Sequence, residues 1–171
     1  MPVFIQKINK FTGILVSVLM GFMVLDVSWQ VFTRFVLRKP SPFSEELAGF
    51  FLIWVSLLGA AYAFYKKAHL GIDILASRLK GFKRKSVEVV INLIIISFAL
   101  LIMVIGGTRL VLLTLQLNQL SPALGIPMGY VYIMIPVSGI LITLYSLGFI
   151  TVIIKNKYPL TKTKKDNELP L

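Results

Sequence analysis

The sequence contains no cysteine and a single histidine, His69. The first absence excludes disulfides, cysteine-ligated zinc or iron–sulfur centres and thiol catalysis. A lone histidine cannot by itself form a histidine metal site or the paired ligands of a haem. A Walker loop, a kinase-like loop and a serine–histidine arrangement are missing as well. The composition therefore predicts a protein that is not an enzyme and that holds no metal or cofactor of its own.

Acidic residues are also scarce, because 7 Asp and Glu stand against 18 Lys and Arg, for a formal net charge of +11. Such an excess could indicate nucleic-acid binding, but the basic residues lie in short segments between apolar runs, and 57% of the chain is hydrophobic. A chain of this length cannot bury so much apolar surface in one soluble core. The pattern is typical of a membrane protein whose basic loops face anionic lipid, so membrane lipids and not nucleic acid are the expected contact.

Four apolar runs predict an all-α integral membrane protein with four transmembrane helices. The expected spans cover residues 11–35, 44–65, 87–117 and 128–154 of a membrane domain at 1–158, which a polar tail at 159–171 follows. About 20 residues are enough to cross a bilayer, so the long third run should tilt or protrude, and Gly106-Gly107 offers it a place to bend. Residues 72–80 mix apolar with basic side chains, which predicts a short interfacial helix, with a solvated basic loop as the alternative.

Lysine and arginine are distributed unevenly between the two sides of this bundle. They gather before residue 11, between residues 66 and 85 and after residue 154, whereas the first connection holds few and the third connection holds none. Basic residues accumulate in cytoplasmic loops. Both termini, the tail and the middle connection are therefore expected in the cytoplasm, with the first and third connections on the outer side.

Ionisable residues interrupt two of the spans. Asp26 lies within the first span and Arg109 within the third, and Arg34 lies near the outer end of the first. Charged groups in a bilayer are costly and normally face a partner. We expect one of the two arginines to pair with an acid at the start of the second span, where Glu45 and Glu46 are the candidates. Asp26 would join through a long arginine side chain or face another protein, and a proton relay through Asp26 is the alternative.

The second span begins with a helix-start signal. Ser41 can cap the helix, Pro42 suits its first position, and acids near the positive end of the helix dipole are favourable. At its other end, His69 and Asp73 are four residues apart and would share a helical face. We interpret them as a cytoplasmic turn that starts the interfacial helix, because two ligands make a weak metal site.

Small residues recur at helix-contact spacing in the first two spans, and such stripes let helices approach closely in lipid. The candidates for packing within the chain or against a partner are Gly13, Ser17, Gly21, Trp54, Ser56, Gly59, Ala60 and Ala63. The third connection is free of charge and stiffened by proline, which suits docking better than solvation, although an ordinary helix–helix turn is the alternative. The candidate docking residues on the two outer connections are Arg38, Lys39, Ser121, Pro122, Gly125 and Pro127.

The segment from residue 30 to residue 75, followed by LSPALGIPMGYVYIMIP, resembles the small membrane subunit, the Q or DctQ-type component, of tripartite ATP-independent periplasmic (TRAP) transporters. The resemblance runs in the same order over nearly the whole chain. It is carried by Arg34, the Glu45-Glu46 pair before Trp54, Gly59-Ala60-Ala61, His69 with Asp73, and Leu124-Gly125-Ile126-Pro127.

The resemblance implies a scaffold in the bacterial inner membrane for a large permease, the M subunit. That subunit would carry the substrate and Na⁺ sites and move them by an elevator motion, while a soluble periplasmic binding protein delivers the substrate. Substrates would be organic acids, and members of the sialic-acid type look most similar. Two other readings stay open: a stand-alone homodimeric exporter of four helices that uses Asp26, and the membrane anchor of a redox enzyme, against which the lone histidine argues.

Overall fold

The computed structural model describes residues 3–66 and 82–154. The predicted interfacial helix at 72–80, the turn residues His69 and Asp73, and the polar tail at 159–171 lie outside the described residues. The elements, in chain order, are α1 Val3–Phe35, α2 Pro42–Tyr65, α4 Phe82–Phe98, the π-helix η1 Ala99–Gly106, α5 Gly107–Gln116, α6 Met128–Tyr132 and α7 Met134–Ile154. They form four helical stretches long and apolar enough to cross a membrane, which confirms the predicted fold class.

Residues close to each helix start explain where α1 and α2 begin. Helix α1 starts at Val3, eight residues before the predicted start of the first span. The buried Ile5 explains this extension, because it continues the packing face of the helix toward the N-terminus. Helix α2 starts at Pro42, and the Ser41 side chain accepts a hydrogen bond from the Ser44 backbone N–H at 3.5 Å. The predicted cap and proline start are therefore confirmed.

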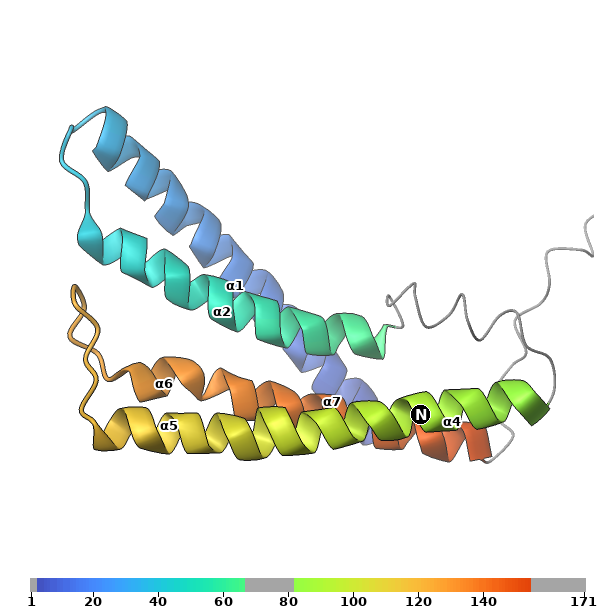
Figure 1. Cartoon of the computed structure of the whole chain (residues 1–171). Coiled ribbons are helices and arrows are strands. Elements are labelled where there is room, and N and C mark those ends of the chain that lie inside the picture. The colour runs from blue at the N-terminus through green and yellow to red at the C-terminus, as the bar shows by residue number, and fades with distance from the viewer. Residues whose placement is uncertain (1–2, 67–81, 155–171) are drawn as a thin grey trace, which may run out of the picture.

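The third span is one long continuous rod made of α4, η1 and α5 (Figure 1). Its central segment is a π-helix, and the Gly107 backbone N–H reaches back to the Ile102 carbonyl, five residues earlier. This π-helix ends within the Gly106-Gly107 pair that marked a possible bend: Gly106 is its last residue and Gly107 its C-cap. A π-helix is rare and changes which side chains a helix presents to its neighbour.

The last span is interrupted, although the sequence predicted one run from residue 128 to residue 154. Helix α6 ends at Tyr132, and α7 begins at Met134. Pro136 explains the break, because its nitrogen has no hydrogen to donate and its ring crowds the carbonyl of Tyr132, four residues earlier. Pro127 immediately precedes α6, as predicted from its position.

The spans pair into two hairpins, α1 with α2 and the α4–η1–α5 rod with α6 and α7. In Figure 1 the hairpins separate toward the end that holds the α1–α2 connection and come together toward the other end. The main core lies where they converge and contains Ile5, Ala61, Tyr145 and Phe149. Tyr145 is fully buried and packs edge-on against the Tyr65 ring, with 5.1 Å between ring centroids.

The second hairpin is held by close backbone approach. A Cβ atom added to Gly139 on α7 would lie 2.7 Å from Met103 Cβ and 3.2 Å from the Ala99 carbonyl oxygen of η1. A Cβ added to Gly129 on α6 would lie 2.5 Å from Leu115 Cγ of α5. Any side chain at these two positions would push the helices apart, so glycine sets how closely they pack.

Candidate functional site

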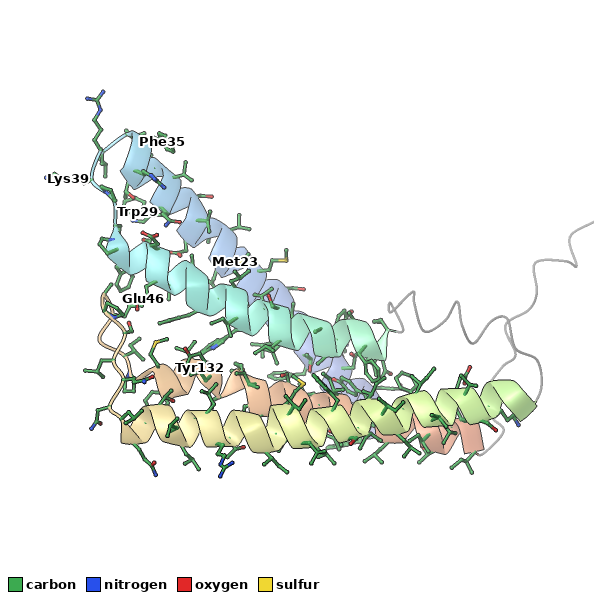
Figure 2. All side chains as sticks on the ribbon, viewed as in Figure 1. Met23, Trp29, Phe35, Lys39, Glu46 and Tyr132 are labelled. Atoms are coloured by element: carbon green, nitrogen blue, oxygen red, sulfur yellow. The ribbon has the colours of Figure 1, made fainter. Side chains whose placement is uncertain are left out.

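The Glu46 carboxylate on α2 binds the connection between α5 and α6. Its Oε2 atom accepts hydrogen bonds from the backbone N–H groups of Ala123, at 2.8 Å, and Leu124, at 2.9 Å. The Ser121 side chain also faces this carboxylate. We call these four residues the Glu46 clamp. Figure 2 shows Glu46 pointing from α2 toward this loop, so the clamp ties the first hairpin to the second where the hairpins have separated.

The loop presents these amides because its own backbone is ordered. Asn118 follows α5 with φ 47, and the N–H groups of Asn118 and Gln119 bond back to Leu115 and Thr114, which closes the helix end in a Schellman motif. The two arms of the loop then pair through an isolated antiparallel bridge between residues 120 and 127. Gly125, at φ 65, lies in its tight turn. The loop's own hydrogen bonds therefore hold the amides that bind Glu46 in position, without a contact from another protein.

This geometry corrects the expected pairing of an arginine with Glu45 or Glu46. Within residues 3–66 and 82–154, neither Arg34 nor Arg109 forms an ion pair with either acid, and both arginine side chains are exposed. Arg34 and Glu45 line one small cavity of about 130 Å³ without bonding each other. Glu46 is satisfied instead by the amides at the turn of the loop. Backbone donors held by a rigid turn can bind a carboxylate at less cost in side-chain entropy than a long arginine.

Asp26 is half-buried on α1 and faces the Ser44 side chain of α2. Its Oδ2 atom is shielded from solvent and has no hydrogen-bond partner among the residues that the structure describes. Ser44 is itself buried, at 2% exposure, and lies close to the Ser41 hydroxyl. The sequence indicated an acid in need of a partner but gave no sign of Ser44, because a serine in the first turn of α2 reads as part of its cap. The described chain therefore leaves one oxygen of the Asp26 carboxylate without a hydrogen bond.

The small residues of the first two helices divide into two groups. Gly13 packs inside the chain, where an added Cβ would lie 2.6 Å from the Tyr62 ring, and Gly59 approaches Val16 of α1. Ala63 is half-buried on the same helix as Gly59. The remaining predicted positions are exposed to the surroundings: Ser17, Gly21, Ser56 and Ala60. Helical periodicity identified both groups but could not separate them.

Trp54 belongs to the internal contacts. Its indole Nε1–H donates to the Val131 carbonyl of α6 at 3.0 Å. This bond lies along α2 from the Glu46 clamp and joins the same two hairpins. Trp54 was predicted as a packing or partner residue, and the structure places its polar atom inside the chain. The interruption of the last span near Ile133 lies beside this carbonyl.

The candidate docking residues lie on the two connections at the clamp end. Arg38 and Lys39 are exposed, and Lys39 points away from the bundle in Figure 2. On the other connection Pro122 and Gly125 are exposed, whereas Ser121 is buried, at 3%. The half-buried Pro127 pairs with Leu120 inside the loop. The basic pair and the tip of the clamp loop are thus available to a partner, and Ser121 supports the clamp from within.

Comparison with known proteins supplies the last observation. A protein of Haemophilus influenzae named as a TRAP transporter small permease protein is 27% identical over 136 residues, which cover 80% of this chain and 83% of that protein. The sialic acid TRAP transporter small permease protein SiaQ of Vibrio cholerae is 29% identical over 58% of this chain and 57% of its own length. The C4-dicarboxylate TRAP transporter small permease protein DctQ of Rhodobacter capsulatus is 34% identical over 56% and 42%.

The family model described as "Tripartite ATP-independent periplasmic transporters, DctQ component" matches residues 23–156. That range includes Asp26, both members of the Glu45-Glu46 pair, the clamp loop and the last three predicted spans. It leaves out the start of α1 and the end of the chain. Because the match covers most of the sequence, the chain belongs to the DctQ component family of tripartite ATP-independent periplasmic transporters.

Proposed function

We propose that this chain is the scaffold subunit of a TRAP transporter and holds a large permease subunit in place while the permease moves an organic acid across the membrane. Asp26 is the observation that carries the proposal. An acid far from either end of α1, with a shielded oxygen that has no partner in the described chain, is unfavourable in lipid. Asp26 is only half-buried, so its side chain can turn this oxygen toward a donor on a second membrane subunit. A stationary scaffold needs such a fixed contact.

Exposed small residues on another side of α1, and on α2, offer the permease a separate surface. Ser17 and Gly21 are four residues apart on α1, and Ser56 and Ala60 are four apart on α2, so each pair shares a helical face. Nothing lies within 4 Å of the position that a Cβ of Gly21 would take. In lipid, such faces gain little from the acyl chains and pack well against another helix. We expect the permease to use the α1–α2 hairpin.

The substrate and the driving ion are further parts of the proposal. The Vibrio relative is named for sialic acid and the Rhodobacter relative for C4-dicarboxylates, and both compounds are carboxylates. An organic acid is therefore the class that we propose, with sialic acid as the narrower candidate. Na⁺ would bind the permease, and a periplasmic binding protein would deliver the substrate. The distribution of basic residues supports an inner-membrane position with both termini in the cytoplasm.

Leaving this chain out tests the scaffold directly. The large permease, expressed with and without the chain, would be reconstituted in liposomes with the binding protein and an inward Na⁺ gradient, and uptake of labelled sialic acid and of labelled succinate would be measured. We expect uptake only when all three proteins are present. Full uptake by the permease and binding protein alone would contradict the scaffold, and transport by this chain alone would favour the small-exporter alternative.

Charge reversal on the first connection tests whether it helps to dock the binding protein. Arg38→Glu with Lys39→Glu is expected to slow uptake about tenfold at low salt and less at high salt, since charges at the rim of an interface act on the association rate. Copurification with the permease should be unchanged. Lys164→Glu with Lys165→Glu, in the polar tail that follows the last span, is the control. Equal uptake in the docking variant and the unmodified protein would remove this connection from the docking surface.

A further inference from the structure

A groove of about 550 Å³ lies between α1 and α2, at the end of the bundle opposite the Glu46 clamp. Its polar end is formed by Asn9 and Lys10 of α1 together with Tyr62 and Lys66 of α2, and it continues along α1 past Ile14 to Val18. These α1 positions follow the spacing of one helical face. The groove lies at the opposite end of the chain from the clamp and the docking surface, and it shares only Ser17 with the face proposed for the permease. The proposed transport role therefore leaves its polar end unexplained.

Asn9 is the first sign that the groove binds a ligand. Its side chain is 5% exposed, yet its Oδ1 atom has no hydrogen-bond partner among the described residues. Buried polar atoms in folded proteins are nearly always paired, and an unpaired acceptor is unfavourable by an amount comparable to a lost hydrogen bond. Asn9 lines the groove, so a rotation of its side-chain amide would bring Oδ1 to a donor on a bound molecule.

Two cations lie at the same end. Lys10 and Lys66 both line the groove and are exposed, and no acidic residue is among the described residues that line it. The Lys66 ammonium lies 5.7 Å from the centre of the Tyr62 ring, and this contact directs its side chain over the groove wall. Tyr62 in turn rests against the bare backbone of Gly13. The polar end therefore offers positive charge together with one unpaired acceptor.

The groove then changes from polar to apolar along α1. Ile14 and Val18 follow Lys10 at steps of four residues and are 56% and 49% exposed. From Lys10 to Val18 the helix rises about 12 Å, which carries the groove from the edge of the apolar run into its interior. The Ser17 hydroxyl on this wall already donates to the Gly13 carbonyl, at 2.9 Å, so it needs no hydrogen-bond acceptor on a ligand. A free anion would leave this apolar part empty, whereas an amphiphile would fill it.

We propose that the groove binds an anionic glycerophospholipid with a hydroxyl-bearing headgroup, of the phosphatidylglycerol type. The phosphate lies between Lys10 and Lys66, a headgroup hydroxyl donates to Asn9 Oδ1, and one acyl chain follows Ile14 and Val18. Phosphatidylcholine has no hydroxyl to donate to Asn9, and its choline cation offsets the charge of its phosphate, so it should bind more weakly. The site needs only this chain, and its test is independent of transport.

Native mass spectrometry of the full, delipidated chain tests the site, with phosphatidylglycerol and phosphatidylcholine titrated separately. We expect tighter binding of phosphatidylglycerol, and an affinity about tenfold lower in Lys10→Gln with Lys66→Gln. The matched control, Lys7→Gln with Lys39→Gln, removes the same charge outside the groove and should bind like the unmodified chain. Asn9→Leu removes the acceptor without changing charge and should weaken phosphatidylglycerol about fivefold.

A second pair of variants changes the apolar part without altering charge. Ser17→Phe fills the groove and should prevent phosphatidylglycerol binding, whereas Ser28→Phe should leave it intact, because Ser28 is an exposed α1 serine with the same kind of backbone bond, to the Val24 carbonyl. Glycerol 3-phosphate at the same concentration should not compete. Equal affinity for the two lipids, equal loss in both lysine pairs, or full competition by glycerol 3-phosphate would each overturn the proposal.

Discussion

Asp26→Lys is expected to separate this chain from the large permease. The substitution places a cation where we propose that a donor of the partner subunit meets the carboxylate, so an attraction becomes a repulsion between buried groups. Removing one member of a buried charge pair typically weakens an interface about a hundredfold, and reversal should do at least as much. Copurification of the permease with the tagged chain, followed by quantitative blotting, would measure the loss.

Two further variants show whether the effect comes from the position of the charge. Asp26→Asn keeps the shape and some hydrogen bonding, so it should retain part of the complex. Leu112→Lys adds a cation at an exposed position of α5, outside the α1–α2 hairpin, and should assemble normally. A complex that forms fully with Asp26→Lys would show that the acid faces lipid or water. A complex that assembles with Asp26→Asn but loses only ion coupling would instead support a proton relay.

Gly139→Leu is expected to destabilise the isolated chain by about 3 kcal/mol, because overpacking at a close helix contact forces the backbones apart. An added Cβ already lies 3.2 Å from the Ala99 carbonyl oxygen, and a backbone atom cannot move aside as the end of a side chain can. The expected result is separation of α7 from the π-helical segment η1. Thermal unfolding of the purified chain in detergent, followed by circular dichroism, would measure it.

The matched control is Gly21→Leu on α1. Nothing lies within 4 Å of its added Cβ, and leucine is a better helix former than glycine, so the isolated chain should be as stable as before or slightly more stable. The same variant should weaken the complex if the permease packs on this face. Equal melting temperatures for the two leucine variants would show that the α7–η1 contact does not limit the stability of the bundle.

The positions of the spans could be predicted from the sequence because long charge-free runs have few other stable states in a protein of this composition. The start of α2 could be predicted as well, since Ser41 and Pro42 act through local backbone geometry. The interruption near Ile133 could have been anticipated from Pro136, whose effect on the preceding turn is also local. In each case the relevant chemistry lies within a few residues of its effect.

The partner of Glu46 could not be predicted in this way. Its ligands are the backbone N–H groups of Ala123 and Leu124, which every residue except proline possesses, so nothing in those side chains marks them. Only the tight turn of the loop makes them available, and the arginines offered a more obvious partner. For the same reason periodicity could not tell that Gly13 packs within the chain while Gly21 remains exposed. Both distinctions depend on how separate helices meet.

The contacts that join α2 to the second hairpin can form only late in the synthesis of the chain. Glu46 and Ala123 are 77 residues apart, and so are Trp54 and Val131. Ribosomes add about 5 to 20 residues per second, so α2 exists for roughly 4 to 15 s before either partner has been made. During that time the α1–α2 hairpin lacks its hydrogen bonds to the clamp loop and to α6. The contact that we propose between Asp26 and a permease already in the membrane can therefore form before the rest of this chain exists.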